Sequence, residues 1–335
     1  MTAATDPIER VDLDTAILMS EHPPVLRDPN KRVVFDIACG PGDVHGGSLG
    51  YSRWAAMALP DAVDADAAAG LVLARDGYFD YVPTFDPADT VEWHVNFADP
   101  DLFVAYGSSL FAQDEMQCAE HPSLGALKEA LVADGRSAVT VEHGQPTPVL
   151  VTGVERRCHV ATDPSDTEGR PHGLYGNAFA RAKVDAVAQA TTRIEPPTMT
   201  NLIAIAAPYP GSGRYRVDEI ERSLTTAYTG FLAAQLESER ERGAKVRVAV
   251  HTGFWGCGAF GGNRVLMALL QVLAARMAGL DRLVFHTGAA GGSAPLEEAL
   301  RLYSEDFEAD ASWSTRGVVD RLEAMAFTWG VGDGN

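Results

Sequence analysis

Lysine is scarce in this chain of 335 residues, because only four of its 27 basic residues are lysines. The 46 acidic residues outnumber the basic ones and give a formal net charge of −19. A surface of this sign repels nucleic acids, which are bound without sequence preference through basic patches. We therefore expect no direct binding of nucleic acid, and we expect any polyanionic ligand to be recognised at a local site.

Cysteine and long apolar runs are also in short supply. The four cysteines, Cys39, Cys118, Cys158 and Cys257, stand far apart and form no CxxC pair, so no zinc site is predicted. No stretch reaches the roughly 20 apolar residues of a membrane-spanning helix, and the polar N-terminus does not resemble a secretory leader. We expect a cytoplasmic protein with free thiols, no metal and no membrane contact.

Apolar segments alternate along most of the chain as they do in α/β proteins. Residues 1–32, with prolines at positions 7, 23, 24 and 29, are predicted to form an irregular arm. From residue 33 onward, short strands alternate with helices, which predicts a sheet covered by helices on both faces. We expect one domain over 33–309, then a helix and tail over 310–335. The clearest strands are 91–98, 149–154, 201–207, 246–250 and 282–288, and the clearest helices are 217–242 and 263–280.

The stretch DIACGPGD, residues 36–43, follows the apolar run Val33-Val34-Phe35. A strand, an acidic residue and a Gly-x-Gly turn resemble the first motif of the S-adenosylmethionine-dependent methyltransferases. Such an enzyme needs an acidic residue at the end of a second strand. Residues 63–70 supply acids, but the segment RWAAMALP before them does not have a strand pattern. A methyltransferase therefore stays an alternative, and the turn is otherwise a connection between a strand and a loop.

The strongest pattern is VRVAVHTGFWGCGAFGGNRVLMALLQVLAA, residues 246–275, in which a strand, a glycine-rich turn and a long helix follow one another. Glycines let the backbone approach a ligand closely. The N-terminus of the helix adds free N–H groups and a positive dipole end, so the segment can hold a phosphate or diphosphate. No P-loop lysine follows, and the spacing is not that of a dinucleotide fingerprint. A tight turn without a ligand is the alternative.

The exact sequence of this segment is more specific than its glycine content. WGCGAFGG followed by LxALLQxLAA closely resembles the C-terminal signature of the poly(ADP-ribose) glycohydrolase family. The preceding RYRVDEIERSLTTAYTGF, residues 214–231, looks like the helix before it in that family. The resemblance implies a macrodomain fold, here a three-layer α/β/α sandwich with a mixed central sheet and extended N- and C-terminal parts. It implies no cofactor. The turn residues that would contact the diphosphate are Phe254, Gly256, Gly258, Ala259, Phe260, Gly261 and Gly262.

The family's second signature then falls on NFADPDLFVAYGSSLFAQDE, residues 96–115. By this resemblance Glu115 is the catalytic acid, Asp114 binds the ribose hydroxyls, and Gln113 shapes the ribose site. Asn96 and Asp99 flank the first element of the signature and are candidate substrate contacts. Breaking a ribose glycosidic bond requires a carboxyl group that protonates the leaving oxygen. An adjacent carboxylate helps to keep that proton in place near neutral pH.

Three further positions fit the family pattern more loosely. GLYGNAF, residues 173–179, resembles the segment whose tyrosine lies over the bound diphosphate and ribose, which makes Tyr175 a candidate and Phe179 its neighbour. Asp86 stands where the acid that contacts adenine would fall. A loop tyrosine on the surface and a solvated acid are the alternative interpretations.

The departures from the family pattern bear on the substrate. The glycine triplet of the second signature aligns with Phe103-Val104-Ala105, and Phe254 replaces an asparagine before the tryptophan of the turn. A bulkier loop is expected to reshape the pocket around the leaving group. We therefore favour a small ADP-ribosylated or NAD-derived molecule, or a single ADP-ribose on a protein, over long poly(ADP-ribose). A non-catalytic module that binds ADP-ribose is the main alternative.

Overall fold

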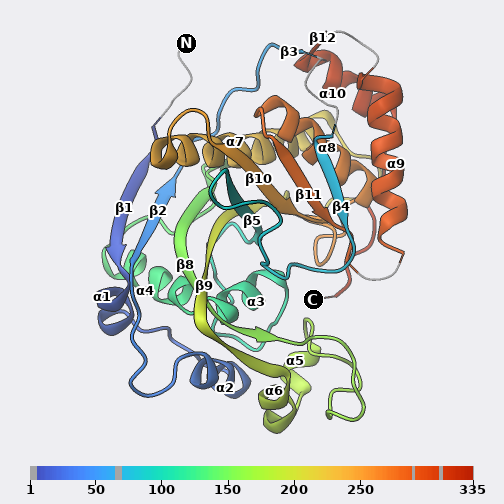
Figure 1. Ribbon diagram of the computed structural model, residues 1–335. Helices are drawn as coiled ribbons and strands as arrows, with labels where there is room; N and C mark the ends of the chain where they lie inside the picture. Colours follow the sequence, from blue (N-terminus) through green and yellow to red (C-terminus); the bar gives the residue numbers. More distant parts are fainter. Residues whose placement is uncertain (1–5, 65–69, 289–290, 309–311, 335) are drawn as a thin grey trace.

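The computed structural model describes residues 6–64, 70–288, 291–308 and 312–334. Its centre is an eight-stranded mixed sheet between two layers of helices (Figure 1), which confirms the predicted fold class. In spatial order the strands are β1 (Glu9–Asp14), β2 (Ser48–Arg53), β8 (Val149–Val160), β9 (Thr191–Ala206), β5 (Thr90–Ala98), β10 (Arg247–Thr252), β11 (Arg282–His286) and β4 (Val72–Arg75). The strands from β1 to β9 are antiparallel, and those from β9 to β4 are parallel. Two small ribbons pair β3 (Ala62–Asp64) with β12 (Ser312–Ser314) and β6 (Val141–Glu142) with β7 (Gln145–Pro146).

Different helices cover the two faces of the sheet (Figure 1). The larger core lies under α7 (Val217–Arg242), α8 (Arg264–Met277), α9 (Ser293–Tyr303), the short π-helix Ser304–Glu308 and α10 (Thr315–Ala324). The other face carries α1 (Thr15–Glu21), α2 (Pro29–Ala38), α3 (Gln113–Glu120), α4 (Ser123–Ala133), α5 (Ala178–Arg181) and α6 (Val184–Ala190). Helix α7 forms because its apolar residues recur at helical spacing and turn one face to the sheet. None of the described helices is both long and apolar enough to cross a bilayer.

The parallel half of the sheet determines where a site can form. Ala98 of β5 pairs with Ala206 of β9, and Thr252 of β10 pairs with Phe285 of β11, so these strands end at one edge. Loops that follow the carboxyl ends of parallel strands meet there, and ligands of open α/β sheets bind in such crevices. We call the end of the sheet that is formed by the carboxyl ends of β9, β5, β10 and β11 the site edge. It is not one of the two edge strands, β1 and β4.

The prediction of an irregular arm over residues 1–32 is wrong for the part that the structure describes. β1 pairs with β2 in register from Glu9↔Arg53 to Asp14↔Ser48, and α1 and the start of α2 follow. Two aspartates start these helices, because the side chain of Asp14 accepts from Ile17 N and that of Asp28 accepts from Asn30 N and Lys31 N. Residues 1–5 of the predicted arm lie outside the described residues.

The run Val33-Val34-Phe35 is helical, so the expected strand before the Gly-x-Gly turn does not exist. It lies inside α2, which begins at Pro29 and is therefore already helical when the valines are reached. A methyltransferase motif requires a strand at this point, so that alternative loses its basis. Of the acidic segment 63–70, residues 65–69 lie outside the described residues.

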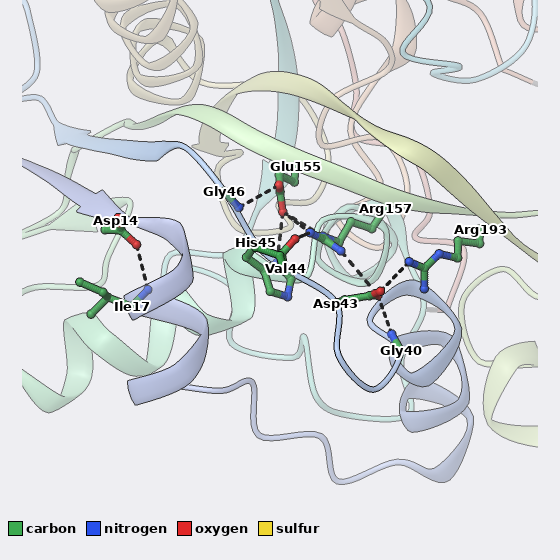
Figure 2. Close-up of polar contacts among 10 residues, drawn as sticks. All are labelled: Asp14, Ile17, Gly40, Asp43, Val44, His45, Gly46, Glu155, Arg157 and Arg193. Atoms are coloured by element: carbon green, nitrogen blue, oxygen red, sulfur yellow. Dashed lines mark hydrogen bonds and ion pairs between the residues drawn. The ribbon is translucent and has the colours of Figure 1, made fainter.

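The loop after α2 has a structural role instead (Figure 2). Asp43 accepts from Gly40 N at 2.7 Å and forms an ion pair with Arg193 of β9 at 2.7 Å. Glu155 of β8 forms an ion pair with Arg157 and lies 3.1 Å from His45 Nδ1. The GPGD turn is thus clasped to β8 and β9 by paired charges.

Candidate functional site

Helix α3 begins at the carboxyl end of β5 and is fastened to that strand by its first residue. Gln113 Oε1 accepts from Phe97 N at 2.8 Å, and Gln113 Nε2 donates to Val95 O at 3.0 Å. The Gln113 side chain therefore pairs with the backbone of β5 as a residue of a neighbouring strand would. This fixes the N-terminus of α3 at the site edge.

The next two residues of α3 are the acid pair, Asp114 and Glu115. Their side chains are only 6% and 4% exposed. Asp114 Oδ1 accepts from Asn96 Nδ2 at 2.9 Å, and Glu115 Oε2 accepts from Ala112 N at 3.0 Å. Each carboxylate thus has a fixed orientation, and both lie in the first turn, where the helix dipole favours negative charge.

Burial keeps the acid pair from losing all its protons at neutral pH. Burial, and then the charge of Glu115, raise the pKa of Asp114 to about 8. Burial also raises the pKa of Glu115, which nearby positive charge and backbone N–H groups oppose. Because the two carboxyls titrate together, the retained proton belongs to the pair. The pair can therefore supply a proton near neutral pH.

The glycine turn, residues 253–262, leaves the carboxyl end of β10 and leads into α8. Gly256 and Gly261 have φ values of 74° and 65°, in the left-handed region that favours glycine. The N-cap of α8 is Asn263, whose side chain accepts from Val265 N and Leu266 N. A Cβ on Gly253 would lie 3.5 Å from Phe97 Cζ, so the turn borders the end of β5. The structure thus brings the turn and the acid pair to the same edge.

Aromatic side chains hold the glycine turn in place. Trp255 is fully buried and donates through Nε1 to Ile205 O at 3.0 Å. Phe254 is half-buried against Phe285, with the guanidinium of Arg264 5.2 Å from its ring centre. Among the other predicted contacts, Ala259 is exposed and Phe260 half-buried.

Tyr175 lies on the loop before α5, next to the residues that start α3. It is 41% exposed, and Gly176 N donates to Phe111 O at 2.9 Å, which ties this loop to the start of α3. Burial, and then the charges of Asp333, Tyr78 and Glu115, raise the pKa of Tyr175 to about 12. The phenol is therefore a neutral donor at the site edge.

The residues past α10 form a C-terminal tail, residues 325–334, that lies on the glycine turn. Gly330 N donates to Gly261 O at 2.8 Å, and Asp333 N donates to Gly258 O at 3.3 Å. A Cβ on Gly258 would lie 3.1 Å from Asp333 Oδ2. The tail thus places backbone and a carboxylate on the residues predicted to bind diphosphate.

Polar and stacking contacts fasten both ends of the tail. Trp329 stacks on Tyr215 with ring centres 4.2 Å apart, and Asn177 Nδ2 donates to Gly334 O at 2.9 Å. The tail therefore runs from the base of α7 across the turn toward the loop that carries Tyr175. Sequence reasoning did not find this contact, because the pairing of GVGDG with the turn is long-range.

Three predicted substrate contacts are corrected by their positions. Asn96 and Phe179 are fully buried. Asn96 supports Asp114, and Phe179 stacks on Phe111 with ring centres 4.1 Å apart. The backbone carbonyl of Asp86 accepts from Thr90 N at 3.0 Å, and its side chain accepts from Ala88 N at 2.9 Å, at the amino end of β5 and so away from the site edge. Asp99, in contrast, is half-buried just after β5, and its charge raises the pKa of both members of the acid pair.

The loop that replaces the glycine triplet does not fill the site with its phenylalanine. Phe103 has a φ of 55°, a conformation that glycine adopts easily and phenylalanine rarely. Its side chain is fully buried in the core with Leu124 and Leu127 of α4. The backbone therefore keeps a glycine-like course, and the expected bulk of this residue lies in the core rather than beside the acid pair.

Three buried histidines, His94 of β5, His251 of β10 and His286 of β11, contact one another across the parallel strands. His251 Nε2 lies 2.6 Å from Glu92 Oε2, and His251 Nδ1 lies 3.0 Å from His286 Nε2. His94 stacks on His251 with ring centres 4.3 Å apart, and neither ring nitrogen of His94 has a hydrogen-bond partner among the described residues. Within those residues, no group of three or more His, Cys, Asp or Glu is arranged to hold a metal ion.

Replacing His94 with phenylalanine is expected to stabilise the fold more in acid than at neutral pH. Burial, and then the charge of His251, hold the pKa of His94 well below its usual range. As the pH falls below about 6.5, the unfolded histidine gains a proton that the folded one does not, so wild-type stability is lost. The advantage of His94→Phe should grow by about 1.4 kcal/mol per pH unit.

Urea unfolding of both proteins near neutral pH and about 1.5 units lower measures this difference. His172→Phe, at an exposed position, is the control. An advantage of His94→Phe that is equal at the two pH values would contradict a neutral, buried His94.

Comparison with known proteins finds similarity to one family over residues 166–291. The family described as "Poly (ADP-ribose) glycohydrolase (PARG), Macro domain fold" matches residues 166–291, which confirms the resemblance drawn from the residues. The chain is also 29% identical over 119 residues to the probable poly(ADP-ribose) glycohydrolase 2 of Arabidopsis thaliana. That match covers 26% of this chain and 23% of the plant protein, so it spans less than a quarter of that relative.

Solved structures named poly(ADP-ribose) glycohydrolase also match this chain, at low sequence identity. One is a mutant poly(ADP-ribose) glycohydrolase from Deinococcus radiodurans in complex with ADP-ribose, 12% identical, with a TM-score of 0.43 over 90% of this chain and 97% of that one. Another is the enzyme from Thermomonospora curvata bound to the inhibitor ADP-HPD, 14% identical, with a TM-score of 0.41 over 86% of this chain and 96% of that one.

Proposed function

We propose, on the premise that residues 166–291 belong to the poly(ADP-ribose) glycohydrolase family, that this chain is a glycoside hydrolase acting on an ADP-ribose-containing substrate. The observation that carries the proposal is the buried acid pair in the first turn of α3, next to the glycine turn at the same edge of the sheet. Hydrolysis of an ADP-ribosyl bond requires this combination of a protonated carboxyl group and a phosphate-binding turn.

Each part of the site has a role in this reaction. Glu115 donates its proton to the leaving oxygen as positive charge develops on the ribose. Asp114 accepts hydrogen bonds from the ribose hydroxyls. The diphosphate binds to N–H groups of residues 256–262 other than those of Cys257, Gly261 and Gly262, which donate within the turn. Tyr175 covers the diphosphate and ribose. Water then attacks the ribose carbon, and its proton returns to the acid pair, which restores the starting state without a cofactor.

The substrate we propose is a small ADP-ribosylated or NAD-derived molecule, or a single ADP-ribose on a protein. Charge supports this choice over a long polymer. The chain carries a net charge of −19, and carboxylates of Asp99 and Asp333 lie beside the site. Each added ADP-ribose unit of a polymer would bring further phosphates toward this negative surface.

Hydrolysis is expected to fall as the pH rises through about 8. Above the pKa of about 8 that burial gives Asp114, the acid pair loses the proton that must be donated. The rate should then drop about tenfold per pH unit. Initial rates between about pH 6 and pH 10, with ADP-ribosylated substrates, measure this limb. A rate that stays level to the alkaline end would contradict a protonated acid pair.

Calorimetric titration with ADP-ribose tests the binding half of the proposal. Gly261→Trp should weaken binding by at least about tenfold, which is 1.4 kcal/mol. A side chain at this φ of 65° strains the turn, and its Cβ would lie 2.7 Å from Gly332 N. The indole therefore takes the place of the tail on the turn and blocks the ligand itself. Gly279→Trp is the matched control, because Gly279 has a φ of 72° at the other end of α8 and open space around it.

S-adenosylmethionine serves as the comparison ligand in the same titration. Binding of ADP-ribose that Gly261→Trp loses and Gly279→Trp keeps supports the proposed site. Equal affinity of both variants would place the ADP-ribose site elsewhere in the molecule. No heat with ADP-ribose in the wild type or in either variant would mean that ADP-ribose is not a ligand of this protein.

A further inference from the structure

One of the four lysines, Lys31 of α2, is buried in the interior next to the acid pair. It is 2% exposed, and its Nζ donates to Tyr106 O at 2.8 Å. The ammonium also lies 5.2 Å from the ring centre of Phe111 and 5.9 Å from that of Phe179. A buried ammonium is costly unless opposite charge lies near, so this position requires an explanation.

The surroundings of Lys31 connect it to the start of α3. Phe111 directly precedes Ala112, the N-cap of the helix that carries the acid pair. Lys31 and Cys118 line one small cavity of about 10 Å³ between α2, α3 and α4. Cys118 Sγ in turn lies 3.9 Å from Asp114 Oδ1. The ammonium is thus packed close to α3, the helix whose first turn carries the acid pair.

The charged groups around Lys31 are mostly acidic. The charges of Asp114, Glu115 and Cys118 on α3, and of Asp28 at the N-cap of α2, all act to raise the pKa of Lys31. On the loop before α3, the Tyr106 hydroxyl donates to Glu129 of α4 at 2.5 Å. Burial lowers the pKa of Lys31 to about 8, and the charge of Glu115 is the strongest influence that opposes this. In return, the charge of Lys31 lowers the pKa of both Glu115 and Asp114.

We propose that Lys31 is a positioning residue that holds the acid pair at one proton, so that one ammonium, one carboxylate and one carboxylic acid form a neutral buried triad. This inference rests on the proposed function. The carboxylic acid donates to the leaving oxygen, and the carboxylate accepts hydrogen bonds from the ribose and later a proton from water. Without the ammonium, both carboxyls would be protonated at neutral pH, and the accepting member would be lost.

Lys31→Met tests the role of the charge, because methionine keeps an unbranched apolar stem beside Phe111. The acidic limb of the hydrolysis profile should move up by at least about one pH unit, the shift expected when an opposite charge is removed. Lys31→Arg keeps the charge and should leave that limb in place. Asn30→Leu is the matched control, since Asn30 joins α2 to Phe179 O and Ala182 O without a charge.

A second measurement does not depend on activity. The chain has only four lysines, so ¹³C-labelled lysine gives four resonances by NMR, and Lys31→Arg identifies the one from Lys31. Its pKa of about 8 should fall in the double variant Asp114→Asn, Glu115→Gln, which removes the carboxylate of the triad, and stay unchanged in Asp101→Asn, a change at an exposed acid outside α3. This pair of variants also decides the question if Lys31→Met does not fold.

The two measurements separate the failure of this inference from failure of the proposed function. If no variant and no wild-type protein hydrolyses any ADP-ribosylated substrate, the function fails, while the lysine titration still reports the triad. If the Lys31 resonance titrates alike in wild type and in the double variant Asp114→Asn, Glu115→Gln, or the acidic limb of Lys31→Met coincides with that of wild type, the role of Lys31 is overturned.

Discussion

Replacing Glu115 with glutamine is expected to lower hydrolysis of an ADP-ribosylated substrate by roughly 10²–10⁴-fold, the usual contribution of a general acid. The amide has the shape of the carboxyl group and can still accept from Ala112 N, so the first turn of α3 should keep its geometry. Binding of ADP-ribose should therefore change little. Rates and calorimetric affinities of the same preparation measure the two effects together.

Asp101→Asn is the control for the general loss of one negative charge, since Asp101 is exposed and pairs with Lys128. It should hydrolyse at the wild-type rate. Wild-type turnover in Glu115→Gln would remove Glu115 from the reaction. Tight binding of ADP-ribose without turnover in the wild type would instead favour the binding module over the enzyme.

Removing the C-terminal tail after Trp329 is expected to raise the affinity for ADP-ribose by about tenfold. A diphosphate on the glycine turn must compete with the contacts that the tail makes to Gly258, Gly261 and Asn177. Each such hydrogen bond stabilises the tail on the turn by about 0.5–1.5 kcal/mol net. The conformational entropy that the tail regains on release offsets part of this stabilisation. The increase should weaken with salt if Asp333 repels the ligand.

Gly332→Val tests the same contact in the full-length chain. A Cβ on Gly332 would lie 2.4 Å from Ala259 O, so the tail cannot keep its place on the turn. Val331→Ala is the control, because Val331 of the same tail is 94% exposed and its side chain can be shortened without moving the tail. Affinity that is unchanged or lower in both the shortened chain and Gly332→Val would mean that tail and ligand occupy different positions.

The parts of the fold and site that the sequence predicts are those fixed by local pattern. The apolar residues of α7 keep helical spacing over most of the length of the helix. The turn before α8 combines five glycines with the end of a strand. Neighbouring parallel strands end at one edge, which is why the acid pair and the glycine turn meet. Helix α7 and the turn depend on residues close together in the chain, whereas the meeting of the acid pair and the turn depends on the long-range pairing of β5 with β10.

The parts that sequence reasoning missed depend on distant contacts. Val33-Val34-Phe35 is too short for its period to separate a strand from a helix, and Asp28 with Pro29 decides in favour of the helix. Lys31, Val34 and Ala38 are spaced as one buried helix face, so the burial of Lys31 was readable once that helix was known. The tail gives no local pattern, because its partners in the glycine turn lie about 70 residues earlier and Asn177 lies 157 residues earlier.

The course of the tail also decides how the protein should be prepared. An affinity tag fused beyond Gly334 would emerge beside Asn177 and the glycine turn, where it would crowd the mouth of the site or pull the tail away from it. Strand β1 lies at the far edge of the sheet from the parallel strands that carry the site (Figure 1). An N-terminal tag leaves the site clear, and titrations of C-terminally tagged protein would report the fusion rather than the native chain.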